Sequence, residues 1–185
     1  MRLTALPYAR LFAALFLLSS ASAVMAQPST VIIVRHAEKA VTPGPDPALS
    51  EAGIERARAL AAAIADAEVG SVITTQFKRT SETAAPVVAA RGLEPLTVQA
   101  SRDMPAHIKA VAEAVRTQPA GTAVLVVGHS NTVPAIINAL GGPTMTELCE
   151  SDYDNLFILQ FTAESSPRLI RARFGAPDDA DGTSC

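Results

Sequence analysis

The stretch Val-Ile-Ile-Val-Arg-His-Ala-Glu, from Val31 to Glu38, joins a short apolar run to two basic side chains. A run of branched apolar residues without alternation is typical of a strand that is buried on both faces of a sheet. Arg35 and His36 follow this strand directly. In open α/β sheets, ligands bind beyond the carboxyl ends of the strands. We therefore expect Arg35 and His36 to lie at a functional site.

Similar apolar runs recur along the chain and alternate with longer stretches of helical composition. The expected strands cover residues 30–34, 69–75, 93–98, 122–127, 155–162 and 168–174, of which the last two are compatible with a hairpin. The expected helices cover residues 51–67, 79–91, 103–117 and 131–140, and Ser50 is a suitable N-cap for the first. This alternation predicts an α/β fold, a three-layer α/β/α sandwich with a mainly parallel sheet.

The first 26 residues have the pattern of a secretory signal peptide. Residues 1–10 contain two arginines and no acid, residues 11–18 are apolar, and small residues lead to Ala26. We expect cleavage after Ala26, with Ala23 as the alternative. The apolar run is shorter than the roughly 20 residues that cross a bilayer. The sequence therefore predicts a periplasmic or secreted protein that has no membrane attachment after cleavage.

The remaining chain is expected to form one domain, residues 27–174, followed by a polar and mobile tail at residues 175–185. Without the two arginines of the leader, 13 basic residues stand against 18 acidic ones. This acidic balance disfavours binding to nucleic acid. The sequence does not indicate an oligomeric state. Cys149 and Cys185 could form a disulfide or be one buried and one frayed thiol, and their spacing does not suggest a metal site.

Two further groups of polar residues follow predicted strands. Arg79 comes shortly after the second strand, and His129, Ser130 and Asn131 come directly after the fourth. Two guanidiniums can offset the charge of a phosphomonoester and bind its oxygens. A neutral imidazole can attack phosphorus, so the hydrolysis of a phosphomonoester at this site would need no metal and no cofactor. His129 and the free N–H groups at Ser130 and Asn131 would add donors for the phosphoryl oxygens.

Taken in order, these motifs resemble the histidine phosphatase superfamily, over a span from Thr30 to about Phe174. The Arg-His-Gly signature of the family is similar to Arg35-His36-Ala37, where Ala replaces Gly. The family's Leu-Thr/Ser-x-x-Gly segment is similar to Leu49–Gly53, its Ser-x-x-x-Arg-x-x-x-Thr-Ala block to Thr75–Ala84, and its hydrophobic-Gly-His segment to Val127–His129. The resemblance implies a phosphoglycerate-mutase-like fold.

By the same resemblance, His36 is the phosphorylated nucleophile, and Arg35, Arg79 and His129 complete the phosphate pocket. The implied function is a metal-independent phosphomonoesterase that acts on a small phosphorylated substrate through a phosphohistidine intermediate. Substrate specificity would depend on residues 39–49, 101–107 and 141–152.

The general acid is the departure from the family pattern, because Ser130 follows His129 where many members have an acid. Asp103 is one candidate, and Glu38, two residues from His36, is the other. Each has a structural alternative. Asp103 could simply cap a helix, and Glu38 could pair with Lys39 or an arginine.

Other classes of protein fit the sequence less well. A phospholigand-binding member without activity is the main alternative, because no clear acid is present. The segment Gly128–Thr132 approximates a hydrolase nucleophile elbow, but no histidine follows it. His36-Ala37-Glu38 lacks the cysteine half of a zinc deaminase motif. A mutase is disfavoured because an exported chain would not meet glycolytic intermediates. His107 is interpreted as an ordinary surface histidine.

Overall fold

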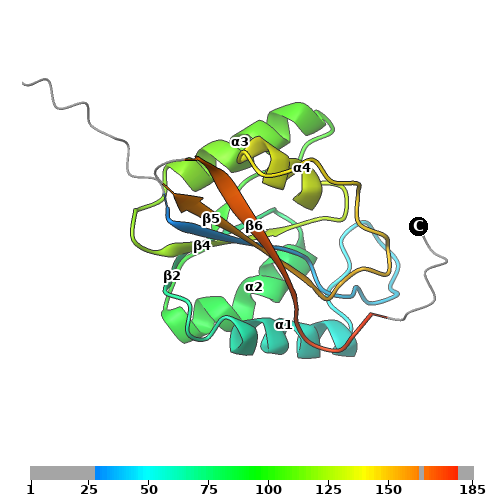
Figure 1. The fold of residues 1–185 in the computed structure, drawn as a ribbon. Coiled ribbons are helices and arrows are strands. Elements are labelled where there is room, and N and C mark those ends of the chain that lie inside the picture. The colour runs from blue at the N-terminus through cyan, green and yellow to red at the C-terminus, as the bar shows by residue number, and fades with distance from the viewer. Residues whose placement is uncertain (1–27, 163–164, 179–185) are drawn as a thin grey trace, which may run out of the picture.

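The computed structural model describes residues 28–162 and 165–178, so the predicted signal peptide lies outside the described residues. Ten elements follow one another along the chain (Figure 1). The strands are β1 (Thr30–Arg35), β2 (Val69–Thr74), β3 (Leu96–Thr97), β4 (Ala123–Gly128), β5 (Asn155–Thr162) and β6 (Ser165–Arg173). The helices are α1 (Glu51–Ala63), α2 (Lys78–Arg91), α3 (Met104–Arg116) and α4 (Val133–Ala139).

The six strands form one sheet in the order β3-β2-β4-β1-β5-β6. The neighbours from β3 to β1 are parallel, while β5 and β6 pair antiparallel and form the predicted hairpin. β1 and β4 are in register up to the pair Arg35 and Gly128, and the His36 N–H donates to the Gly128 carbonyl at 3.0 Å. The carboxyl ends of these two strands are therefore level.

The helices cover both faces of the sheet, with α1 and α2 on one side and α3 and α4 on the other (Figure 1). A hydrophobic core lies on each face of the sheet, and alternate residues of β1 pack into one core or the other. Val31 and Ile33 pack on the side of α3 and α4, whereas Ile32 and Val34 pack on the side of α1 and α2. This confirms the three-layer α/β/α sandwich and the buried central strand. Among the described residues, no helix is both long and apolar enough to cross a membrane.

Several predicted boundaries differ from the observed ones. α1 ends at Ala63 instead of residue 67, because a turn leads from it into β2. β3 contains only Leu96 and Thr97, and Pro95 before it has no N–H to extend the pairing with β2. α4 begins at Val133 instead of residue 131, which leaves Ser130 and Asn131 in the preceding turn.

The start of α1 is packed against the segment that follows His36. Ser50 caps the helix, and its Oγ accepts a hydrogen bond from the Gly53 N–H at 3.1 Å. Gly53 lies so close to Glu38 that a Cβ atom there would be 2.2 Å from the Glu38 carbonyl oxygen. Close backbone approach therefore explains the glycine at this position.

The first part of the predicted tail is tied to the domain, so the expectation of mobility is wrong for residues 175–178. Arg56 donates to the Phe174 and Ala176 carbonyls at 3.1 and 2.8 Å. The Asp178 carboxylate accepts hydrogen bonds from the backbone N–H groups of Tyr153 and Asp154. A buried arginine and an anchored carboxylate hold this segment against α1.

Candidate active site

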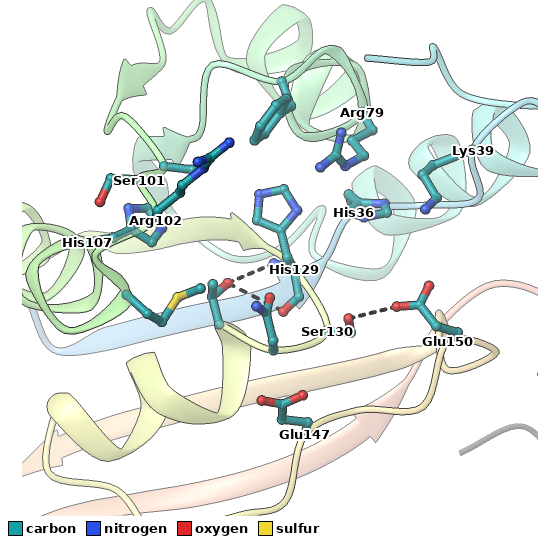
Figure 2. Close-up of a pocket in the computed structure, with 15 residues that line it drawn as sticks. His36, Lys39, Arg79, Ser101, Arg102, His107, His129, Ser130, Glu147 and Glu150 are labelled. Carbon is teal, nitrogen blue, oxygen red and sulfur yellow. Dashed lines mark hydrogen bonds between the residues drawn. The ribbon is translucent and has the colours of Figure 1, made fainter. Parts of the chain in front are cut away.

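A cavity of about 590 Å³ opens where β1, β2 and β4 end (Figure 2). His36 follows β1, His129 follows β4, and Arg79 is in the first turn of α2. All three side chains line the cavity. The remaining lining residues are Lys39, Phe77, Ala100, Ser101, Arg102, Met104, His107, Ser130, Asn131, Thr132, Glu147 and Glu150.

His36 is only 3 % exposed, and its Nδ1 lies 2.8 Å from the Ala37 carbonyl oxygen. Because a carbonyl oxygen can only accept, Nδ1 must carry the hydrogen, which leaves a lone pair on Nε2. Burial lowers the pKa of His36 to about 3, and the charges of His129, Arg35 and Arg79 contribute. The Ala37 N–H donates to Thr83 Oγ1 of α2 at 2.9 Å, which fixes the segment after the nucleophile.

The His129 ring meets the His36 ring edge to face, with 5.3 Å between centroids. Its Nε2 lies 3.2 Å from Thr75 Oγ1, and that hydroxyl also lies 3.0 Å from Thr80 Oγ1. Burial, followed by the charge of Arg79, lowers the pKa of His129 to about 4. Both imidazoles are therefore neutral over most of the pH range.

Arg79 extends toward the two histidines, and its guanidinium lies 4.2 Å from the centroid of the Phe77 ring. Its Nη1 is 3.8 Å from Asp46, and its buried Nε has no hydrogen-bond partner among the described residues. Most of the donors of this guanidinium therefore remain available to an anion.

Arg35 shares the strand end with His36, but the loop after α4 occupies its guanidinium. Nη1 donates to the carbonyls of Cys149, Glu150 and Asp152 at 2.7, 2.9 and 3.3 Å. Nη2 donates to Glu150 Oε2 at 2.8 Å, and the guanidinium lies over the Tyr153 ring. Arg35 is 1 % exposed and does not line the cavity, in contrast to Arg79.

Part of the chain matches a known protein family. The sequence model of branch 1 of the histidine phosphatase superfamily matches residues 31–106, which include His36 and Arg79. The matched segment therefore has the sequence pattern of the histidine phosphatase superfamily. A comparison of the whole chain with curated proteins finds no match.

Two solved structures share the fold at low sequence identity. The protein histidine phosphatase SixA, complexed with tungstate, is 19 % identical, with a TM-score of 0.57 over 78 % of this chain and 96 % of the other. A mycobacterial glucosyl-3-phosphoglycerate phosphatase, complexed with inorganic phosphate, is 16 % identical, with a TM-score of 0.59 over 80 % of this chain and 97 % of the other. Both show that this chain has the phosphoglycerate-mutase-like fold.

Ser130 and Asn131 line the cavity, but not from a helix start. The N–H groups of Thr132 and Val133 both bond the His129 carbonyl, so a turn precedes α4. Ser130 Oγ donates to Glu150 Oε1 at 3.1 Å. The helix therefore begins at Val133 instead of residue 131, and the turn uses the N–H groups of Thr132 and Val133. Phosphate binding by the N–H groups of Ser130 and Asn131 stays a prediction.

Neither predicted general acid lines the cavity. Asp103 is the N-cap of α3, where its Oδ1 accepts from the Ala106 N–H at 3.1 Å. Glu38 Oε1 accepts from Arg56 Nε and Nη2 at 2.8 and 2.7 Å. Asp103 therefore caps a helix and Glu38 pairs with an arginine, which are the structural alternatives that the sequence left open. Their roles as acids stay predictions.

Two carboxylates that do line the cavity, Glu147 and Glu150, were not among the predicted site residues. Both lie in the irregular stretch 141–152, which the sequence indicated only as a region for specificity. Glu150 reaches Arg35 across 115 positions of the chain. No local pattern encodes that contact, so strand ends alone could not identify these acids.

The interpretation of His107 as a surface residue is wrong. His107 is 3 % exposed and lines the cavity. It lies on the buried face of α3 with Val111 and Val115. These residues are spaced at i, i+4 and i+8, so the apolar periodicity of α3 is the signal that places His107 inside.

Within the described ranges, no three His, Cys, Asp or Glu side chains form a group that could hold a metal ion. Cys149 is disulfide-bonded, and its predicted partner Cys185 lies outside the described residues. Cys149 also provides one of the carbonyls that bind Arg35. The residue that forms this disulfide therefore also helps to hold Arg35.

Proposed function

We propose that the chain is a metal-independent phosphomonoesterase that forms a phosphohistidine on His36. The observation that carries this proposal is the fixed tautomer of His36. The Ala37 carbonyl keeps the hydrogen on Nδ1 at 2.8 Å, so Nε2 has a free lone pair beside Arg79 and His129. A neutral imidazole is a competent nucleophile toward phosphorus and needs no metal to activate it.

The reaction would proceed by two in-line displacements. In the first, a bond forms between His36 Nε2 and phosphorus, the ester bond breaks, and an acid protonates the leaving oxygen. In the second, water attacks phosphorus, the bond to Nε2 breaks, and the proton of the water returns to the acid. Arg79 and His129 would stabilise the charge on the phosphoryl oxygens in both steps. Arg35 could contribute once it exchanges Glu150 for the substrate.

The proton donor can be assigned by substitution. Asp103 or Glu38 would have to break an existing contact, whereas Glu147 is exposed at the cavity and forms no hydrogen bond or ion pair with another described residue. We propose to compare D103N, E38Q and E147Q on p-nitrophenyl phosphate and phenyl phosphate. Loss of the true proton donor should slow the hydrolysis of phenyl phosphate more than that of p-nitrophenyl phosphate. Phenolate is the poorer leaving group and depends more on protonation of its oxygen.

The direct test is turnover of p-nitrophenyl phosphate between pH 4 and 8, with His36→Ala beside the native protein. We expect turnover that orthovanadate inhibits and chelators do not, and its loss in His36→Ala. Near-normal turnover in the variant would exclude the phosphohistidine mechanism. Absence of turnover with phosphate binding retained would favour the alternative, a non-catalytic phospholigand-binding member.

The proposal includes an exported location, periplasmic or secreted, which rests on the leader pattern of residues 1–26. A small phosphorylated substrate would then be hydrolysed outside the cytoplasm. Fractionation of cells that produce the full chain, with N-terminal sequencing of the mature form, tests this. A retained residue 1 would contradict cleavage after Ala26.

A further inference from the structure

His107 has one ring nitrogen without a hydrogen-bond partner among the described residues. His107 Nδ1 lies 3.0 Å from the Gln99 carbonyl oxygen, whereas Nε2 is buried and has no hydrogen-bond partner among the described residues. His107 is 3 % exposed and forms part of the cavity wall. The proposed mechanism does not use it.

The contact with Gln99 decides what Nε2 can bind. A carbonyl oxygen only accepts, so Nδ1 carries the hydrogen and Nε2 of the neutral ring is an acceptor. A buried acceptor without a protein donor is satisfied only by a donor that enters the cavity. A ligand that places an O–H or N–H group at this end of the cavity would satisfy it.

The position of His107 separates this end from the phosphoryl site. Figure 2 shows His129 between His36 and His107, so His107 lies at the end of the cavity that is away from the nucleophile. The cavity of about 590 Å³ is large enough for a ligand of several carbon atoms. Phe77 and Met104 give this wall apolar surface, while Ser101 and Arg102 add polar groups.

Arg102 restricts the kind of donor. It is exposed on the cavity wall and forms no hydrogen bond or ion pair with another described residue. Its positive charge disfavours an ammonium group nearby. A carboxylate has no hydrogen to give to Nε2. A hydroxyl group can donate to His107 Nε2 and accept from Arg102, so it fits both side chains.

We propose that His107 and Arg102 form a subsite for the leaving group, in which a substrate hydroxyl donates to His107 Nε2. The substrate class is then a hydroxylated phosphomonoester of the sugar or polyol phosphate kind. This proposal rests on the proposed function, because it assumes that the phosphoryl group binds at His36.

The test compares substrates that differ in hydroxyl groups. Glucose 6-phosphate, ribose 5-phosphate and sorbitol 6-phosphate are assayed against cyclohexylmethyl and cyclopentylmethyl phosphate. The variant His107→Asn keeps an N–H for the Gln99 carbonyl but has no acceptor at the position of Nε2. We expect it to lower kcat/KM by about 10- to 100-fold for the best hydroxylated substrate and by less than about threefold for the apolar ones.

The controls separate a specific effect from a folding defect. Lys109→Ala removes an exposed charge from the same helix and should change neither class of substrate. Arg102→Met should weaken the hydroxylated class only. Equal losses for both classes in His107→Asn, or a native protein that prefers the apolar esters, would overturn the proposal.

Binding measurements keep the two proposals distinguishable. If the native protein turns over none of these esters, the proposed function has failed. Calorimetry with the same hydroxylated and apolar phosphates still tests the subsite. Preferential binding of a hydroxylated ester that disappears in His107→Asn would support it, and equal binding of both classes would overturn it.

Discussion

Glu150 Oε2 lies 2.8 Å from Arg35 Nη2, so a carboxylate is bound to one of the arginines predicted to hold phosphate. The other carboxylate oxygen accepts from Ser130 Oγ at 3.1 Å. Under the proposed function, Glu150 therefore occupies donors that are predicted to bind a phosphoryl oxygen. Burial acts to raise its pKa, but the charge of Arg35 and the Ser130 hydrogen bond outweigh this, and the pKa of Glu150 lies below its usual range.

Glu150→Gln should strengthen the binding of phosphate analogues. The side chain is 68 % exposed, so we expect the inhibition constant of orthovanadate to fall by only about three- to tenfold, as for an exposed ion pair worth roughly 1 kcal/mol. Glu147→Gln, at the same cavity, is the matched control and should change this constant less. Weaker binding of orthovanadate to Glu150→Gln would instead show that Glu150 positions Arg35.

Arg79→Ala should reduce catalysis without unfolding the domain. Its loss removes the guanidinium that faces the two histidines, and we expect kcat/KM to fall by roughly 100- to 1000-fold. Arg79→Lys should recover part of this, because it restores the charge but not the forked donors. Arg58→Ala, which removes an exposed arginine from α1, is the control. An Arg79→Ala variant with native kcat/KM would remove Arg79 from the phosphate site.

The free energy of unfolding should fall as the pH is lowered below about 6.5. The folded-state pKa values of His36 and His129 are about 3 and 4, so the unfolded chain takes up protons in this range and the folded chain does not. Each histidine should contribute roughly 1.4 kcal/mol per pH unit between pH 6 and the folded-state value, and nothing above pH 7.5.

Urea denaturation at pH 7.5, 6.5, 5.5 and 4.5 measures this dependence. His36→Asn removes one of the two groups and should flatten the profile, whatever its effect on stability at pH 7.5. An unchanged slope in the variant would mean that His36 is protonated in the folded protein.

Arg56→Ala should destabilise the domain by about 3–5 kcal/mol, because it leaves Glu38 and Asp178 without their buried cation. Arg56 Nη2 lies 2.7 Å from Glu38 and 3.6 Å from Asp178. Urea denaturation at pH 7 measures the change. Glu38→Gln should also lower stability while leaving the dependence of rate on the leaving group unchanged. A steeper dependence would identify Glu38 as the proton donor.

Gly53→Ala should disturb the nucleophile segment from a distance. A Cβ atom at residue 53 would lie 2.2 Å from the Glu38 carbonyl, so the backbone after His36 must move. We expect a loss of stability of about 1–3 kcal/mol, typical of overpacking, together with a lower kcat. Ala52→Ser, at the exposed neighbouring position, is the control. Unchanged thermal unfolding and kcat would show that this contact is not tight.

Much of the framework is predictable because it depends on local patterns. The apolar runs of β1 and β4 are buried on both faces, and their shared register places His36 beside His129. The strand-end rule therefore predicted which side chains meet. Arg79 follows the same logic through β2 and α2. These positions need only the order of elements and the direction of the strands.

The remaining features depend on contacts between distant segments. The orientation of Arg35 is set by carbonyl groups more than 110 residues away, in a loop without regular structure. Glu147 and Glu150 reach the cavity through the same loop. The burial of His107 was within reach of the sequence, since its spacing to Val111 and Val115 follows the apolar face of α3. The prediction placed His107 at the surface because histidine is polar, although the periodicity of α3 placed it on the buried face.

The two outer strands of the sheet differ in how they limit contact with other molecules. β3 contains only two residues, so it offers few unpaired backbone groups. β6 is longer, but it includes Pro167, and three of its exposed side chains are Arg168, Arg171 and Arg173. Proline lacks a donor, and like charges repel a second copy of the strand. The open sheet therefore has protection against edge-to-edge aggregation at high protein concentration.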